Sequence, residues 1–190
     1  MKLAILFPGI GYHTDKPLLY YSRMLAKQFQ YDIIPVPYGN FPTDVKGSKE
    51  KMEASFLSAL EQTETILSDV DFSAYEEVLF ISKSIGTAVA SAYAKRHELT
   101  THNIYFTPVE ASLDFMEQPG IVFTGTADPW LETSLVENAC KEKHFPLTIL
   151  KDANHSLETS DALQDLKHLQ EIMKQVETYL LTLSGGKKID

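Results

Sequence analysis

The chain has 190 residues and a formal net charge of −9, with 17 Lys or Arg residues against 26 Asp or Glu residues. A chain of this length normally folds as one domain with a full hydrophobic core. The hydrophobic fraction of 44% and the nine glycines and nine prolines exclude collagen-like and disordered proteins. An acidic surface repels phosphate groups, so we expect neither nucleic acid nor a membrane as a partner.

The sequence contains a single cysteine, Cys140, and no long apolar stretch. One thiol excludes an internal disulfide and a thiolate metal cage, so we expect no metal. The apolar run at residues 3–7 ends at Pro8 and is shorter than the apolar core of a secretory signal. No stretch approaches the length of a membrane span, and we therefore expect a cytoplasmic protein.

Short apolar runs alternate with longer amphipathic stretches, which is typical of βαβ units. The short runs predict six strands, at 3–7, 32–36, 78–81, 103–106, 121–124 and 147–150. Helical spacing predicts a helix that starts at 14–17 and further helices over 49–69, 85–97, 133–143 and 161–183. Because crossovers between parallel strands place helices on both faces of the sheet, the fold class is α/β. We expect one three-layer α/β/α domain over residues 1–183, with a mostly parallel six-stranded sheet, and a flexible tail at 184–190.

The pattern also indicates which face of one helix is buried and where an irregular segment lies. In the helix at 49–69, we expect the apolar residues to face inward, Leu57 and Ile66 among them. The segment at 108–118 reads as short and irregular. In parallel sheets of this class, the site lies beyond the carboxyl ends of the strands, so the residues just after each strand are the candidates.

The third predicted strand runs directly into Ser82-Lys83-Ser84-Ile85-Gly86 and then into a helix of small residues. This strand–turn–helix context is the one that a nucleophile elbow requires. The small residues Ser82 and Gly86 fit positions where the two backbones nearly touch. Ser84 is then the candidate nucleophile, and the N–H of Ile85 would face a developing oxyanion. The alternative is an ordinary helix cap formed by Ser82 or Ser84.

A serine hydroxyl needs a base, and two of the six histidines, His13 and His155, follow a strand directly. His155 lies after the last strand, which favours a base over a surface loop histidine. Asp128 follows the fifth strand and is the candidate acid that orients the imidazole. Taken alone, an Asp-Pro pair is a turn and helix start. The order Ser84, Asp128, His155, with each residue just after a strand, is the order of the α/β-hydrolase triad.

Four segments, FPGIG, SKSIG, GTADPW and ANHSLE, together resemble the α/β-hydrolase superfamily over nearly the whole chain. The sequence is most similar to the small, cap-poor members related to dienelactone hydrolase. This resemblance implies a minimal α/β-hydrolase fold, because there is no room for the two strands with which the family usually begins. The first glycine of the family's elbow is Ser82 here.

The resemblance also implies the remaining parts of a site. The second oxyanion donor would be the N–H of Ile10, with Gly9 or Gly11 as alternatives. Lipase-like members carry the acid after the preceding strand, which nominates Glu110 or Asp114, and Glu110 ranks second after Asp128. Since 108–118 is too short for a lid, we expect an open, shallow pocket. Its expected lining residues are Gly9, Gly11, Tyr12 and Trp130.

The function expected from these residues is that of a serine hydrolase that cleaves a small ester or thioester through an acyl-enzyme. The expected partner is a small-molecule ester substrate, and no metal or cofactor is implied. The alternative is a non-catalytic binding protein that has kept the fold. Aromatic residues in the loops leave open an interface for a homodimer.

Overall fold

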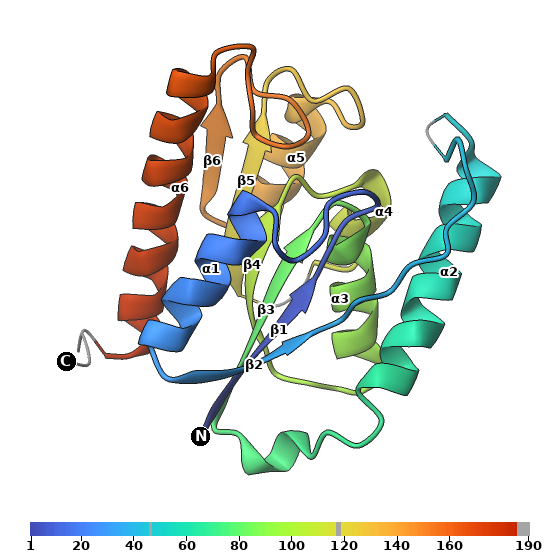
Figure 1. The fold of residues 1–190 in the computed structure, drawn as a ribbon, viewed down its shortest axis with the longest axis vertical. Coiled ribbons are helices and arrows are strands. Elements are labelled where there is room, and N and C mark those ends of the chain that lie inside the picture. Colours follow the sequence, from blue (N-terminus) through green and yellow to red (C-terminus); the bar gives the residue numbers. More distant parts are fainter. Residues whose placement is uncertain (46, 117–118, 186–190) are drawn as a thin grey trace.

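The computed structural model describes residues 1–45, 47–116 and 119–185 and contains one six-stranded sheet in the order β2-β1-β3-β4-β5-β6 (Figure 1). The prediction of a mostly parallel sheet is confirmed, and every pair of neighbouring strands is parallel. The tail expected at 184–190 lies, from residue 186 onward, outside the described residues. The strands are β1 (Lys2–Phe7), β2 (Tyr31–Pro35), β3 (Glu77–Lys83), β4 (His102–Phe106), β5 (Gly120–Gly125) and β6 (Leu147–Leu150).

Helices cover both faces of the sheet, which gives the expected three layers (Figure 1). Helices α1 and α6 pack against each other on one face, and α2 and α3 pack against each other on the other. A 3₁₀ turn at Phe72–Ala74 precedes β3. The helices are α1 (Pro17–Gln28), α2 (Lys49–Ile66), α3 (Ile85–Arg96), α4 (Glu110–Leu113), α5 (Thr133–Glu142) and α6 (Ala162–Leu183).

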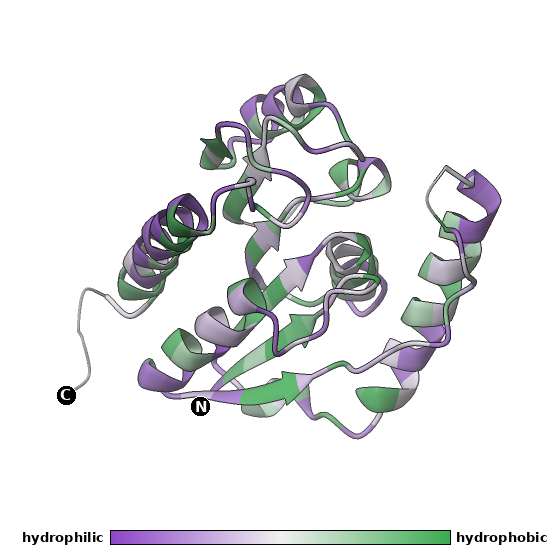
Figure 2. Ribbon diagram, turned by 45° about the horizontal axis from the view of Figure 1, so that its top comes forward, coloured by the Kyte–Doolittle hydropathy of each residue, from purple (hydrophilic) through white to green (hydrophobic). Residues whose placement is uncertain are grey.

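The central strands supply side chains to both layers, because successive residues of a strand point to opposite faces. In β1, Ala4 and Leu6 belong to the core beneath α1 and α6, whereas Leu3, Ile5 and Phe7 belong to the core beneath α2 and α3. The strands accordingly carry long hydrophobic stretches, while the helices show mixed polar and apolar bands (Figure 2). Burial on both faces explains why the strands read as continuous apolar runs in the sequence.

The structure corrects the expected inward face of α2. Leu57 and Ile66 are exposed to 56% and 37%, whereas Ser55, Ala59 and Thr63 are fully buried. The hydroxyls of Ser55 and Thr63 donate to backbone carbonyls one turn earlier in the helix, at 2.7 Å each. Their polarity is therefore satisfied within the helix, and their small size lets α2 approach its neighbours closely.

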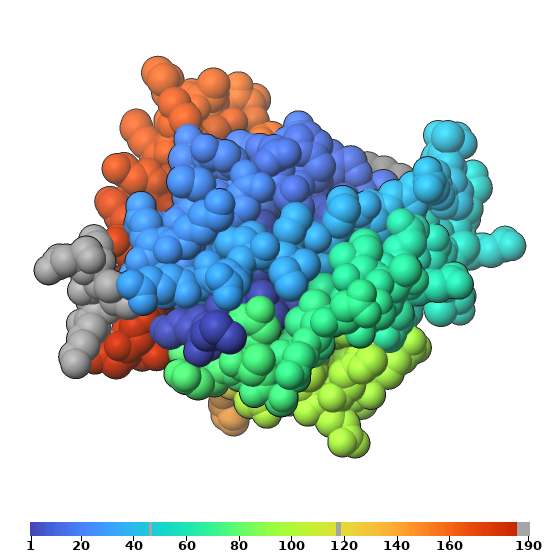
Figure 3. All heavy atoms as spheres, turned by 60° about the horizontal axis from the view of Figure 1, so that its bottom comes forward, coloured from blue at the N-terminus to red at the C-terminus, as the bar shows by residue number. Residues whose placement is uncertain are grey.

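The amino ends and the carboxyl ends of the strands lead to different kinds of residues. At the amino ends of the strands, the N-terminal residues lie beside the segment that precedes β3, where the Met1 ammonium and the Glu76 carboxylate are 3.2 Å apart (Figure 3). The carboxyl ends of the strands lead into the loops that contain the candidate site residues. In the described part of the chain, none of the helices combines the length and apolar character needed to cross a bilayer.

Candidate active site

Ser84 lies in a sharp turn between β3 and α3. Its backbone has φ 57° and ψ −128°, which is strained for a residue with a side chain. Its N–H donates to the carbonyl of Phe106 in β4, at 3.0 Å. A Cβ on Gly86 would lie 2.3 Å from the carbonyl oxygen of Phe7, so only glycine fits where α3 crosses β1.

Ser84 occupies the N-cap position of α3, but its side chain makes no capping hydrogen bond. The interpretation of SKSIG as an ordinary helix cap therefore does not describe Ser84. Ser82, which stands where the family's elbow has glycine, is fully buried, and its hydroxyl donates to the carbonyl of Ile104 at 3.3 Å. The extra hydroxyl thus finds a partner in the neighbouring strand.

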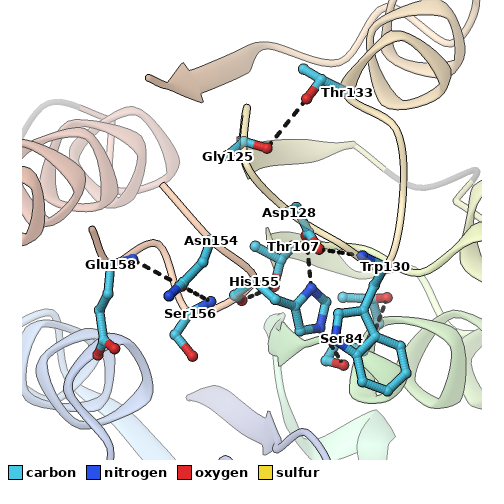
Figure 4. Close-up of polar contacts among 11 residues, drawn as sticks. Ser84, Thr107, Gly125, Asp128, Trp130, Thr133, Asn154, His155, Ser156 and Glu158 are labelled. Atoms are coloured by element: carbon cyan, nitrogen blue, oxygen red, sulfur yellow. Dashed lines mark hydrogen bonds and ion pairs between the residues drawn. The ribbon is translucent and has the colours of Figure 1, made fainter. Parts of the chain in front are cut away.

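Ser84, His155 and Asp128 form a continuous hydrogen-bonded series at the carboxyl ends of β3, β6 and β5 (Figure 4). The Ser84 Oγ lies 2.8 Å from the Nε2 of His155, and the Nδ1 of His155 lies 2.7 Å from the Oδ2 of Asp128. Because an ionised carboxylate only accepts, the Nδ1–H donates to Asp128 and leaves Nε2 to accept the proton of the Ser84 hydroxyl.

Asp128 is held rigidly in the loop after β5. Its side chain is 1% exposed, and its Oδ1 accepts the N–H of Trp130 at 2.9 Å. The other candidate acid, Glu110, is exposed at the start of α4. Of the two carboxylates, Asp128 is therefore the one that the structure brings to the imidazole.

The loop that carries His155 is attached to its neighbours by polar contacts. The N–H of Asp152 donates to the hydroxyl of Thr126 at 2.7 Å, and the N–H of Ala127 donates to the carbonyl of Ala153 at 3.0 Å. The hydroxyl of Thr107 donates to the main-chain carbonyl of His155 at 2.9 Å (Figure 4). Thr107 did not enter the sequence-based list, although it follows the fourth strand directly and so met the rule used to find the others.

The loop after β1 passes directly over Ser84. A Cβ on Gly9 would lie 3.0 Å from the Cβ of Ser84. The N–H of Gly9 already donates to the carbonyl of Tyr12 at 3.1 Å, which leaves Ile10 as the better candidate for a second oxyanion donor. Within the described residues, the N–H groups of Ile10 and Ile85 have no acceptor, so both are available to a ligand.

The structure corrects the expectation that Tyr12 lines a pocket. Its side chain is only 7% exposed and packs in the core, because its hydroxyl accepts the N–H of Leu18 at 3.1 Å. Its ring lies beneath the ammonium of Lys83, with 5.0 Å between the nitrogen and the ring centre. Tyr12 therefore supports the loop after β1 from inside.

Lys83, next to Ser84, is 1% exposed. Burial lowers the pKa of its ammonium to about 7, and the carboxylates of Asp128 and Glu158 oppose that shift only in part. The elbow thus encloses an amine that loses its proton far more readily than an exposed lysine does.

Two features lie near the candidate nucleophile. The indole of Trp130 stacks on the imidazole of His155, with ring centres 5.5 Å apart (Figure 4). A surface hollow of about 260 Å³ adjoins the loop after β1. Its lining includes Gly9, Gly11, His13, Tyr38 and Phe41. Trp130 thus covers the base, and the hollow begins at the oxyanion loop.

No protein-family model and no curated protein matches the sequence. Solved structures do match in fold. Est1E from Butyrivibrio proteoclasticus is 12% identical with a TM-score of 0.69, over 95% of this chain and 87% of its own. A phospholipase/carboxylesterase from Dyadobacter fermentans is 16% identical with a TM-score of 0.66, over 95% and 90%.

A third neighbour is an alpha-beta serine hydrolase homologue from Coxiella burnetii, which is 12% identical with a TM-score of 0.68, over 95% of this chain and 85% of its own. At these identities the likeness concerns the fold, and it extends across nearly the whole of each chain. Together with the parallel six-stranded sheet and the strained turn at Ser84, it identifies the chain as having the α/β-hydrolase fold.

Proposed function

We propose that the protein is a serine hydrolase that cleaves small esters or thioesters through an acyl-enzyme. The observation that carries the proposal is the unbroken series from the Asp128 carboxylate through His155 to the Ser84 hydroxyl, with contacts of 2.7 and 2.8 Å. A binding protein has no need of a hydroxyl, an imidazole and a buried carboxylate in this order.

In the first half of the reaction, His155 accepts the proton of Ser84 through Nε2 while Oγ attacks the carbonyl carbon of the substrate. Asp128 orients the imidazole and stabilises its charged form. The N–H groups of Ile85 and Ile10 donate to the oxyanion of the tetrahedral intermediate. The imidazolium then protonates the departing alcohol or thiol, which leaves the acyl group on Ser84.

In the second half, water takes the place of the leaving group. His155 removes a proton from that water, which attacks the acyl carbon and forms a second tetrahedral intermediate. This intermediate collapses when the bond to Ser84 breaks and His155 returns the proton to Oγ. The acid product leaves, and the site regains its starting protonation.

The hollow beside the oxyanion loop bears on the size of the substrate. Its volume of about 260 Å³ is small, and Tyr38 and Phe41 give it an aromatic wall. Pockets for drug-sized ligands run from about 300 to 1,000 Å³, so a short acyl or small aryl group fits better than a long chain. Two fold neighbours are compatible with this view: Est1E is described with bound ferulic acid, and XC6422 from Xanthomonas campestris is described as lacking a lid.

The proposal is tested with a fluorophosphonate probe and with p-nitrophenyl acetate. We expect the folded protein to form an adduct at Ser84 and to turn over the ester. Ser84→Ala should form no adduct and lose at least about 10³-fold in kcat, while its melting temperature stays nearly unchanged. Ser156→Ala, which removes a hydroxyl one residue after the base, is the matched control and should retain activity.

Two outcomes would contradict the proposal. An absence of any adduct in the folded wild-type protein would favour the non-catalytic binding protein. Equal turnover by wild type and Ser84→Ala would assign the activity to another group. A series of p-nitrophenyl esters with acyl chains of increasing length, together with a short acyl thioester, tests the substrate class, and we expect kcat/KM to fall as the chain lengthens.

A further inference from the structure

We propose that Thr107 is a positioning residue of the active site, a role that rests on the function proposed above. Its hydroxyl holds the main chain of His155 at the place from which the imidazole reaches Ser84. Thr107 does not touch the reacting atoms and acts through His155 (Figure 4).

The first support is the place of Thr107 in the sheet. It follows β4 directly, and β4 lies between β3, which leads to Ser84, and β5, which leads to Asp128. Its N–H donates to the carbonyl of Phe123 in β5 at 2.8 Å, so its backbone continues the ladder of the sheet. A side chain that starts from this position has a fixed origin between the two parts of the site.

The second support is the contact itself. The hydroxyl of Thr107 donates to the carbonyl oxygen of His155 at 2.9 Å, across 48 positions of sequence. Thr107 is fully buried, which protects this bond from competition by water. The carbonyl belongs to the same residue as the imidazole, so a shift of this peptide group moves the ring. The other anchors described above act earlier in the loop, at Asp152 and Ala153.

The third support is backbone strain. Thr107 has φ 42°, a conformation that β-branched residues rarely adopt and that glycine or asparagine would adopt more readily. A strained residue persists only where its surroundings require it, and such residues gather at functional sites. Glycine would relieve the strain but has no donor, whereas the hydroxyl of Thr107 supplies the bond to His155.

The decisive variants separate the hydroxyl from the shape of the side chain. Thr107→Val keeps the branched shape and removes the donor, and Thr107→Ser keeps the donor. Using p-nitrophenyl acetate, we expect kcat of the valine variant to fall about 10- to 100-fold with KM within about twofold, because a small displacement of a base is costly in rate. The serine variant should stay within about threefold of wild type.

A matched control comes from the far end of the same strand. Thr101 is also buried, and its hydroxyl accepts from the side-chain amide of Asn103 at 3.1 Å. Thr101→Val removes a buried hydroxyl without touching the site, so we expect lower thermal stability and wild-type kcat. If Thr107→Val folds poorly, Thr107→Ala is the second variant. It removes the donor and also the branching that strains this backbone conformation.

A readout that does not depend on turnover distinguishes failure of this proposal from failure of the proposed function. The Nδ1–H of His155, bonded to Asp128, should give a downfield proton NMR signal in the wild type and in Thr107→Ser. We expect it to broaden or vanish in Thr107→Val. If wild type forms no probe adduct, the hydrolase proposal fails and this signal still tests positioning. Unchanged kcat and an unchanged signal in both the valine and alanine variants would overturn the role of Thr107, as would a serine variant as slow as the valine variant.

Discussion

Ser84 and His155 approach each other from two regions that are held by different kinds of contact. The elbow is fixed by packing: α3 is buried along most of its length, and Gly86 lies against the backbone of β1 without room for a methyl group. The loop of His155 is buried at Ala153 and Leu157 but exposed at Asp152 and Asn154, and hydrogen bonds from neighbouring loops attach it close to the imidazole.

This difference predicts that substitutions in the two regions impair the protein in different ways. Packing contacts form with the core itself, so a change at the elbow should act mainly on folding. The loss of a polar attachment at the carboxyl ends of the strands costs about 1 to 3 kcal/mol, less than a backbone clash at the elbow, but the attachment sets the position of the base to a fraction of an ångström. A change in the loop should therefore act mainly on rate.

The largest effect is expected at the carboxylate that orients the base. Asp128→Asn keeps the size of the side chain but offers an amide to Nδ1, which favours the wrong tautomer of His155. We expect kcat for p-nitrophenyl acetate to fall about 10⁴-fold while urea unfolding changes little. Glu110→Gln is the control and should keep wild-type kcat. Loss of kcat in Glu110→Gln, together with wild-type kcat in Asp128→Asn, would identify Glu110 as the acid.

At the elbow, Gly86→Ala should instead act on folding. The new Cβ would lie 2.3 Å from the carbonyl oxygen of Phe7, a backbone atom that cannot step aside. We expect a loss of several kcal/mol in the free energy of unfolding or no folded protein at all, measured by urea denaturation. Gly39→Ala is the stability control, since its Cβ would meet nothing within 4 Å. A stable Gly86→Ala protein would refute steric control of the elbow.

Lys83 makes the stability of the elbow depend on pH. Burial lowers the pKa of its ammonium from 10.5 to about 7. Between these values the unfolded chain holds a proton that the folded chain has lost, so the free energy of unfolding should rise with pH, by up to about 1.4 kcal/mol per unit. Below about pH 7 both states are protonated, and the folded protein bears the full cost of the buried charge.

Lys83→Met removes this contribution. We expect the variant to gain stability relative to wild type at pH 6 and the advantage to shrink steadily toward pH 10. The measurement is the difference between the urea-unfolding free energies of the two proteins at each pH, in which the titration of other groups cancels. If the free energies of unfolding of the two proteins change with pH in parallel, Lys83 keeps its proton in the folded protein.

Much of this arrangement was readable from the sequence. All six strands were found because burial on both faces makes each one a continuous apolar run. Ser84, Asp128 and His155 became candidates because each comes shortly after a strand, and parallel topology places such residues at the same end of the sheet. Those inferences need only chain order and polarity.

What escaped prediction depends on contacts across space. The inward face of α2 was misread at Leu57 and Ile66 because buried serines and threonines can satisfy their hydroxyls within the helix. Tyr12 was expected at the rim, but its hydroxyl finds a backbone partner inside. The bond from Thr107 to His155 joins residues 48 positions apart, and no local pattern encodes it.

The smallest effect is expected at Asn154, which shapes the loop from within. Its Oδ1 accepts the N–H groups of Ser156 and Glu158, at 2.7 and 3.2 Å. Asn154→Ala removes both bonds, but the side chain is exposed and water can replace it. We expect a two- to fivefold loss of kcat and about 1 kcal/mol of stability, measured by ester hydrolysis and urea unfolding. Asn154→Asp keeps the acceptor and should restore most of the rate. A larger loss than in Thr107→Val would mean that the loop holds its own shape and that its attachment to the sheet is secondary.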